Sequence, residues 1–205
     1  VARQMGLPIE RLIVASNQND ILTRFFEQGA MRREAVNPSL SPSMDIQVSS
    51  NFERLLFELL GRDGVETARV MADFAATGKF SLLEAVMVEA RSLFSAYRLD
   101  DAGTIAEIAN TSRDDGMVLD PHSAVGVSAA RRAIADGTLP DRTPVVALAC
   151  AHPAKFQDAV EQATGTLPAL PAHLADLMQR PERTHLVEAS DSAVKALVLE
   201  RKRSL

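Results

Sequence analysis

The apolar positions in the first part of the chain form two different patterns. A short continuous apolar run over residues 11–16, bounded by polar residues, predicts a buried strand that leads into a helix over 21–28. The next stretch, 36–51, holds two prolines and five serines without hydrophobic period, which indicates a loop. Apolar side chains then recur at the spacing of one helical face. This spacing predicts a helix over 51–60, ended by Gly61.

The stretch 64–112 is predicted to be a helical insertion. Helices are expected over 65–76 and 100–109 from their apolar spacing. Between them, Ser81 and Glu84 have the spacing of a capping box, in which a serine and a glutamate satisfy each other's backbone N–H groups at a helix start. Another helix is therefore expected to begin near Ser81.

Two candidate strands differ in strength. Residues 96–99 have only a weak strand or turn pattern, whereas 145–149 form a continuous run of small and β-branched apolar residues. Such a run is typical of a strand buried on both faces of a parallel sheet. Between the two, Asp120 can accept hydrogen bonds from free backbone N–H groups, and Pro121 fits the first helical position. A helix is expected to follow, ending near residue 136.

The rest of the chain is predicted to be helical, and the whole pattern indicates the fold class. One helix ends at Gly165, a short one ends at Met178, and the last covers 190–202. The alternation of strands and helices predicts an α/β fold, part of a doubly wound and mostly parallel sheet with helices on both faces. Ligands of such sheets bind beyond the carboxyl ends of the strands, which selects residues 16–20 and 150–152 as the expected site.

Composition and charge exclude several classes of function. The net charge of −5 does not favour nucleic-acid binding, and the longest apolar run is far shorter than the roughly 20 residues of a membrane helix. One cysteine permits no internal disulfide and fits a reducing compartment, so we expect a cytoplasmic protein without nucleic-acid or membrane partners. The histidines and the cysteine lack the spacing of zinc ligands, so no metal is expected, and no glycine-rich nucleotide loop is present.

Cys150 stands at the carboxyl end of the stronger predicted strand and allows three interpretations. Cys150 is a nucleophile, an inert buried thiol, or a weak hydrogen-bond partner of a ligand. His152 lies two residues further on, but this spacing alone does not place it as the base that would activate a nucleophile. Lys155, in the first turn of the next helix, opposes the helix dipole unless an anion binds nearby, and a functionless exposed lysine is the alternative. His122 and His152 each flank a proline at a helix start, where capping or packing is the ordinary role.

Four stretches together carry a resemblance to a known family. They are LPIERLIVASNQND (7–20), SPSMDIQVSSNFERLLFEL (41–59), LDPHSAVGVSA (119–129) and LACAHPAKF (148–156). In this order the sequence resembles the threonine synthases, pyridoxal-phosphate enzymes whose fold is similar to that of tryptophan synthase β and threonine deaminase. Chains of that family are longer, so we expect this one to be a C-terminal half. The resemblance implies that 1–180 form the C-terminal portion of the large α/β domain, and that 181–205 form a helix packing on it.

The resemblance also implies an activity. Threonine synthases convert O-phosphohomoserine and water to L-threonine and phosphate, with pyridoxal phosphate as cofactor. The lysine that carries the cofactor is implied to lie outside this chain, so no catalytic residue is expected here. The missing N-terminal half of the same protein is the expected partner. Residues 1–8 agree with this, because Gly6 and Pro8 have the pattern of a helix end.

Site roles follow from the same resemblance. Cys150 holds a position usually occupied by threonine or serine, which faces the pyridine nitrogen of the cofactor, and Asn17 is implied to lie near the cofactor. A thiol is a weaker donor than a hydroxyl, so Cys150 is a departure from the family. Lys155, His152 and Asp20 are expected to bind the substrate, with Lys155 close to its phosphate.

Two other functions stay open at this point. One is a related pyridoxal-phosphate lyase or deaminase of the same fold, and the other is a non-catalytic, threonine-synthase-like binding protein. The Ser-Pro-Ser-Met-Asp segment at 41–45 and the His-Pro-Ala-Lys-Phe segment at 152–156 argue against the first. The second depends on whether the rest of the protein contains the cofactor lysine.

Overall fold

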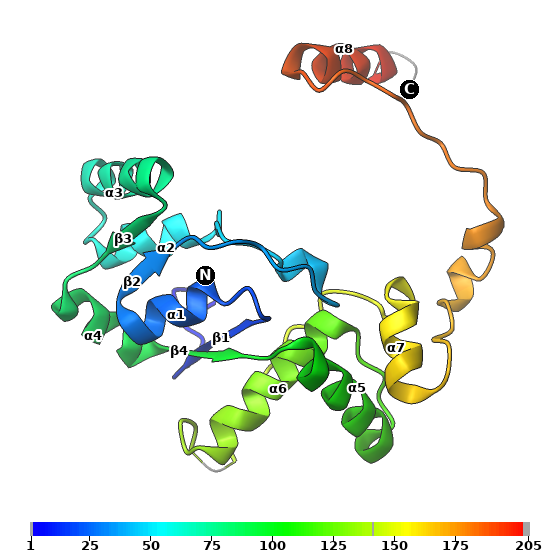
Figure 1. The fold of residues 1–205 in the computed structure, drawn as a ribbon, viewed down its shortest axis with the longest axis horizontal. Coiled ribbons are helices and arrows are strands. Elements are labelled where there is room, and N and C mark those ends of the chain that lie inside the picture. Colours follow the sequence, from blue (N-terminus) through cyan, green and yellow to red (C-terminus); the bar gives the residue numbers. More distant parts are fainter. Residues whose placement is uncertain (1, 141, 203–205) are drawn as a thin grey trace. The chain divides into compact units, whose positions relative to one another are not determined.

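The computed structural model describes residues 2–140 and 142–202, which fall into two compact units, Val1–Ala169 and Leu170–Leu205. The first unit contains two small sheets among helices (Figure 1). One sheet pairs β1 (Leu12–Ser16) with β4 (Phe94–Arg98), and the other pairs β2 (Ala30–Arg32) with β3 (Lys79–Ser81). The helices of this unit are α1 (Ile21–Gln28), α2 (Phe52–Leu59), α3 (Gly64–Thr77), α4 (Glu84–Leu93), α5 (Asp101–Asp115), α6 (Pro121–Ala135) and α7 (Gln157–Thr164).

Strands β1 and β4 are parallel and in register, with Ser16 opposite Arg98, and helices cover both of their faces. On one face, Val14 and Ala96 pack against the core that α1 contributes to. Because side chains alternate along a strand, Tyr97 points to the other face. There its hydroxyl donates to Asp136 just beyond the end of α6 at 2.9 Å. The predicted α/β class with helices on both faces of parallel strands is confirmed.

The main core is a group of phenylalanines between α1, α2, α3 and the strands. Phe25 is fully buried, and its ring centroid lies 4.8 Å from that of Phe52 and 5.2 Å from that of Phe26. Phe26 in turn stacks on Phe94 of β4, and Phe74 meets Phe80 edge to face. This group holds α1 against the sheet, and it thereby fixes the polar turn between β1 and α1.

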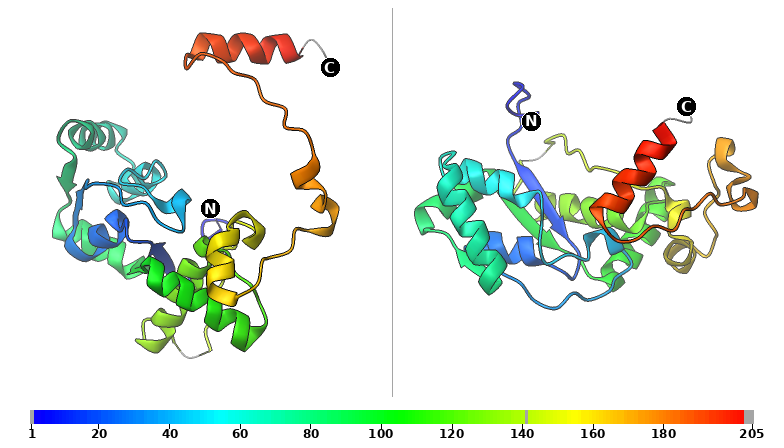
Figure 2. Two further views of the ribbon diagram at one scale, coloured as in Figure 1. Left: turned by 45° about the vertical axis from the view of Figure 1, so that its right-hand side comes forward. Right: turned by 90° about the horizontal axis from the view of Figure 1, so that it is seen from above.

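A second, smaller core joins α5, α6 and α7. Ile108, Leu119 and Ala124 form it, with Val127 and Ala163 packed against it. Figures 1 and 2 show α6 and α7 each lying beside α5. This core brings the start of α6 and the segment before α7 to the same part of the unit.

Among the strands and caps of the first unit, two expectations are wrong, and the alternative of strand or turn at 96–99 is decided in favour of a strand. Residues 144–150 lie exposed and form no strand, with Val146 82% exposed, because a buried strand needs neighbours on both edges and the described residues provide none there. Residues 94–98, by contrast, form a full strand, because pairing with β1 compensates for a weak local pattern. Ser81 ends β3 and caps nothing, since α4 starts after Leu83.

The predicted helix end near Gly6 is confirmed in its local geometry. The N–H of Leu7 donates to the carbonyl of Ala2 at 3.1 Å, and the N–H of Gly6 donates to that of Arg3 at 3.0 Å. Gly6 has a φ of 94°. This pair of bonds around a left-handed glycine is the Schellman arrangement that closes a helix.

The second unit consists of short turns and one helix. Two 3₁₀ turns, Ala172–Leu174 and Leu177–Gln179, replace the short helix that was expected to end at Met178. Helix α8 (Asp191–Lys202) confirms the predicted last helix. The expected division of the complete protein after residue 180 stays a prediction. Among the helices of the described residues, none has the length and apolar character to cross a membrane.

The end of α1 depends on Gly29, which has a φ of 71° and donates its N–H to Phe25 at 2.8 Å. A Cβ at this position would lie 3.1 Å from Cγ of Met87. We therefore expect Gly29→Ala to lower the free energy of unfolding by about 1–2 kcal/mol, because a residue with a Cβ is strained in the left-handed conformation. The close contact of the new methyl group with Met87 should lower it further.

Gly116 offers a matched control for that substitution. It has a φ of 68° at the end of α5, and a Cβ there would meet no atom within 4 Å. Urea unfolding of both variants should give the larger loss for Gly29→Ala. Equal losses would show that Met87 does not resist the added methyl group.

Candidate functional site

Polar residues gather at the edge where the carboxyl ends of β1 and β4 meet. Residues 17–20 follow β1, and residues 99–101 follow β4. The two strands are parallel, so these segments lie side by side at the edge where α/β sheets bind ligands. A loop that we call the serine loop (residues 37–45) is bonded to both segments.

Asn17 and Asn19 fasten the serine loop to the end of β1. The buried side-chain amide nitrogen of Asn17 lies 2.7 Å from the hydroxyl of Ser39, 3.0 Å from that of Ser41 and 2.8 Å from Oδ1 of Asp45. Asn19 donates to the same Asp45 oxygen at 2.9 Å. Both amides are therefore committed to holding the loop.

Asp45 is the centre of this network. Besides the two asparagines, it accepts from the backbone N–H of Ser39 at 2.9 Å and from the Ser39 hydroxyl at 2.6 Å. At the other side, the backbone N–H of Leu40 donates to Asp101, the first residue of α5, at 3.1 Å. The serine loop thus joins the ends of both strands.

Asp20 lies between two arginines at the start of α1. Its carboxylate is 2.8 Å from Nε of Arg24 and 3.5 Å from Nε of Arg98. Arg24 also pairs with Glu34 at 3.0 Å, and its side chain is largely buried, whereas that of Arg98 is about half exposed. The negative charge of Asp20 is thereby balanced by cationic neighbours at the sheet edge.

The N-terminus of α6 meets the serine loop through Asp120 and His122. Asp120, 1% exposed, accepts from the backbone N–H groups of His122 at 2.9 Å and Ser123 at 3.4 Å, which confirms the predicted cap. It also contacts Nδ1 of His122 at 3.0 Å and the hydroxyl of Ser123. Nε2 of His122 accepts from the backbone N–H of Ser43 at 3.2 Å.

Phe156 ties the segment from Cys150 to Phe156 to this group. The ring of Phe156 lies 4.7 Å from that of His122. His152 caps a 3₁₀ turn (Pro153–Lys155) by accepting from the N–H of Ala154 at 3.2 Å, and this agrees with its capping interpretation. Cys150 is exposed, so the interpretation as a buried thiol is not met in this structure.

Lys155 also differs from its expected position. It ends the 3₁₀ turn and does not lie in the first turn of α7, which begins at Gln157. Its ammonium group is exposed and lies 5.9 Å from the centre of the Phe156 ring. The described residues therefore bring Asn17 and Asp20 to one edge, with Lys155 and His152 joined to it through Phe156 and His122.

Sequence reasoning missed Ser39, Asp45 and Asp101. The loop was recognised as irregular, but its partners lie far away in the chain, so no local pattern marks them. The available signal was the single aspartate inside a serine-rich loop next to the Asn-Gln-Asn-Asp run at 17–20. Recognising β4 as the neighbour of β1 would have added Asp101.

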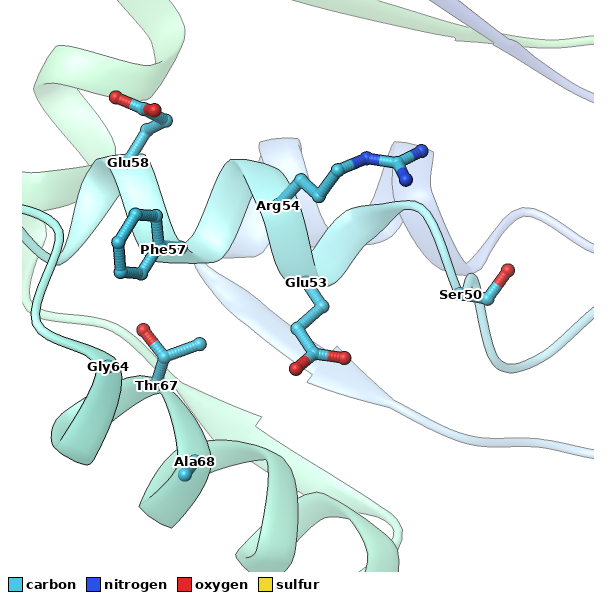
Figure 3. A pocket seen from close by; sticks show the side chains of 8 residues that line it. All are labelled: Ser50, Glu53, Arg54, Phe57, Glu58, Gly64, Thr67 and Ala68. Atoms are coloured by element: carbon cyan, nitrogen blue, oxygen red, sulfur yellow. The ribbon is translucent and has the colours of Figure 1, made fainter.

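Two surface hollows lie elsewhere on the first unit. One, of about 570 Å³, opens between α2 and α3, where the side chains of Phe57 and Thr67 point toward each other (Figure 3). The other, of about 490 Å³, lies against β2 and β3. None of the predicted site residues lines either hollow. Among the described residues no cluster of histidine, cysteine and carboxylate side chains could hold a metal ion.

The fold and the polar edge define a class, the α/β proteins that bind small molecules beyond the carboxyl ends of parallel strands. Comparison with known sequences identifies the family within it. Residues 123–198 match the family model described as threonine synthase, C-terminal. The threonine synthase of Pseudomonas aeruginosa is 48% identical over 199 residues, which are 97% of this chain and 42% of that protein. The threonine synthase of Corynebacterium glutamicum is 36% identical over 206 residues, which are 98% of this chain and 42% of that protein.

Solved structures agree with the sequence comparisons. The crystal structure of pyridoxal-phosphate-bound threonine synthase from Brucella melitensis is 46% identical with a TM-score of 0.88, over 98% of this chain and 42% of that one. Yeast threonine synthase gives a TM-score of 0.86 at 33% identity, over 100% of this chain and 44% of that one. The chain is therefore similar along nearly its whole length to a portion of threonine synthases, as the resemblance predicted, and it spans less than half the length of these relatives.

Proposed function

We propose that this chain is the C-terminal portion of a threonine synthase, which converts O-phosphohomoserine and water to L-threonine and phosphate. One observation carries the proposal. All four sequence stretches that resemble the family meet in one contact network: Asn17 bonds to Asp45, Ser43 bonds to His122, and His122 packs on Phe156. The similarity to the Pseudomonas aeruginosa enzyme over 97% of this chain supports the same reaction.

Pyridoxal phosphate is the cofactor that this proposal requires, and it supplies an electron sink when it is bound. The described residues do not form a complete site for it: Cys150 is exposed, and the amide nitrogen of Asn17 is bonded to the serine loop. We propose that Cys150 and Asn17 form one wall of its site, and that the lysine and the other walls come from the rest of the protein.

The substrate is proposed to bind beside the same edge. O-phosphohomoserine carries a phosphate dianion. The site must bind this phosphate and release it, and it must then admit the water molecule that adds to the substrate. The exposed ammonium group of Lys155 is suited to the phosphate, and His152 is its exposed neighbour in the 3₁₀ turn. Asp20, balanced by Arg24 and Arg98, is proposed to contact the substrate near the ammonium group that every amino acid carries.

A chimera tests the proposal in a living cell. This chain would replace the aligned 42% of the Pseudomonas aeruginosa threonine synthase, so that the relative supplies the remaining residues. The chimera is expected to restore growth without threonine to a bacterial strain that lacks its own threonine synthase. Failure of a soluble, cofactor-binding chimera to restore growth would count against the proposed function.

Lys155 allows a sharper prediction in this chimera. Lys155→Ala should raise KM for O-phosphohomoserine about tenfold or more, because a hydrogen bond to a charged group contributes about 1.5–3 kcal/mol. Cofactor absorbance should change little. Lys79→Ala is the matched control, since Lys79 is also exposed but lies on β3. An unchanged KM in Lys155→Ala would assign Lys155 to the solvated surface.

A further inference from the structure

His122 has a hydrogen-bond partner on each side of its ring, and the two partners come from different segments of the chain. Its side chain is 10% exposed. Nδ1 faces the carboxylate of Asp120 at 3.0 Å, and Nε2 faces the backbone N–H of Ser43 at 3.2 Å. The ring also lies beside that of Phe156, tilted by 57° at a centroid distance of 4.7 Å. Two segments far away in the sequence, at Ser43 and Phe156, therefore meet the ring beside its own neighbour Asp120.

The partners of the ring determine its tautomer. An ionised carboxylate only accepts hydrogen bonds, so the proton of the neutral ring belongs on Nδ1, toward Asp120. The N–H of Ser43 only donates, so Nε2 must be unprotonated. The neutral Nδ1–H form satisfies both contacts, whereas a proton on Nε2 would set two donors against each other. This assignment follows from the hydrogen-bond partners on both sides of the ring.

Asp120 is itself held firmly. It is buried, it caps the 15-residue helix α6, and it accepts from two backbone N–H groups as well as from the hydroxyl of Ser123. The helix dipole favours a negative charge at this end. The carboxylate is therefore a fixed point from which the ring of His122 can be oriented.

We infer that His122 is a positioning residue that sets the tip of the serine loop against α6. Asp120 orients the ring, the ring holds Ser43, and the opposite side of the loop is held by Asp45, Asn17 and Asn19. The loop is thus held by the segment after β1 and by the start of α6, in addition to its bond to Asp101 at the start of α5. The effect of this clamp on threonine formation rests on the proposed function, but the clamp itself does not.

Two substitutions separate the two sides of the ring. The side chain of His122→Asn reaches only as far as Nδ1, so it can still donate to Asp120 but cannot reach Ser43. The carbonyl of His122→Gln reaches as far as Nε2, so it can still accept from Ser43. His173→Asn is a control on an exposed histidine outside both the clamp and the proposed site.

NMR of the ¹⁵N-labelled chain tests the clamp directly. The ring nitrogens of His122 should give the shifts of the Nδ1–H tautomer, and amide exchange at Ser43 should become about tenfold faster in His122→Asn and recover in His122→Gln. An Nε2–H tautomer, or unchanged exchange at Ser43 in His122→Asn, would overturn the inference.

Kinetics of the chimera separate this inference from the proposed function. His122→Asn is expected to lower kcat/KM for O-phosphohomoserine about tenfold, with recovery in His122→Gln. A chimera that forms no threonine while the NMR results hold would refute the proposed function and leave the clamp intact. Equal loss in both variants would refute the role of the Ser43 contact in catalysis.

Discussion

Phe25→Ala is expected to lower the free energy of unfolding by about 3–5 kcal/mol, the range for a large aromatic side chain removed from a packed core. Phe25 is fully buried, and its ring lies within 6.1 Å of Phe26, Phe52 and Phe80. These neighbours come from three elements and cannot all move inward to fill the space. The substitution should also loosen α1, which begins directly after the polar segment 16–20.

Phe57→Ala is the control for the loss of a phenylalanine from a less buried position. Phe57 is only partly buried, and it lines the hollow between α2 and α3. Urea unfolding should give a loss for Phe57→Ala well below that for Phe25→Ala. Similar losses would contradict the assignment of the main core to the phenylalanines around α1.

Asp120→Ala is expected to lower the free energy of unfolding by about 2–4 kcal/mol. An ordinary cap contributes about 1 kcal/mol, but Asp120 is buried and also serves the ring of His122 and the hydroxyl of Ser123. Alanine would leave those donors without an acceptor in a largely buried site, and each unsatisfied group costs about 1–3 kcal/mol. The total loss is expected to be smaller than the sum of these separate costs, since some of the donors can turn toward solvent.

Asp63 is the matched control for Asp120, because it also caps a helix but is not part of a buried hydrogen-bond network. It caps α3 by accepting from the N–H groups of Val65 and Glu66, and these bonds lie at the surface. Asp63→Ala should therefore cost only about 1 kcal/mol. Circular dichroism and urea unfolding of the two variants would measure the difference. Equal costs would mean that Asp120 acts as a simple helix cap.

Local patterns predicted the elements whose structure depends on their own residues. The apolar run before Ser16, the helical stripe from Phe52 and the Asp120-Pro121 cap all form as expected. Each depends on interactions within a few residues. The α/β class followed from their order along the chain.

Features that depend on distant partners could not be predicted in the same way. Residues 94–98 become a strand by pairing with β1, and 145–149 stay unpaired although their apolar character is stronger. In the site, Asp45 is bonded to Asn17, which lies 28 positions away in the chain. The sequence indicated the edge of the sheet at which Asn17 and Asp20 lie, but the contacts of Asp45 and His122 with the serine loop required the structure.

The most direct test of the central claim is the product analysis of the purified chimera with the Pseudomonas aeruginosa enzyme. Incubated with O-phosphohomoserine and pyridoxal phosphate, it is expected to release L-threonine and inorganic phosphate in equal amounts, as the parent enzyme should in parallel. A folded, cofactor-binding chimera that releases ammonia and a 2-oxo acid would contradict the account in favour of a lyase or deaminase. A chimera that binds the cofactor and releases no product would contradict it in favour of a non-catalytic protein.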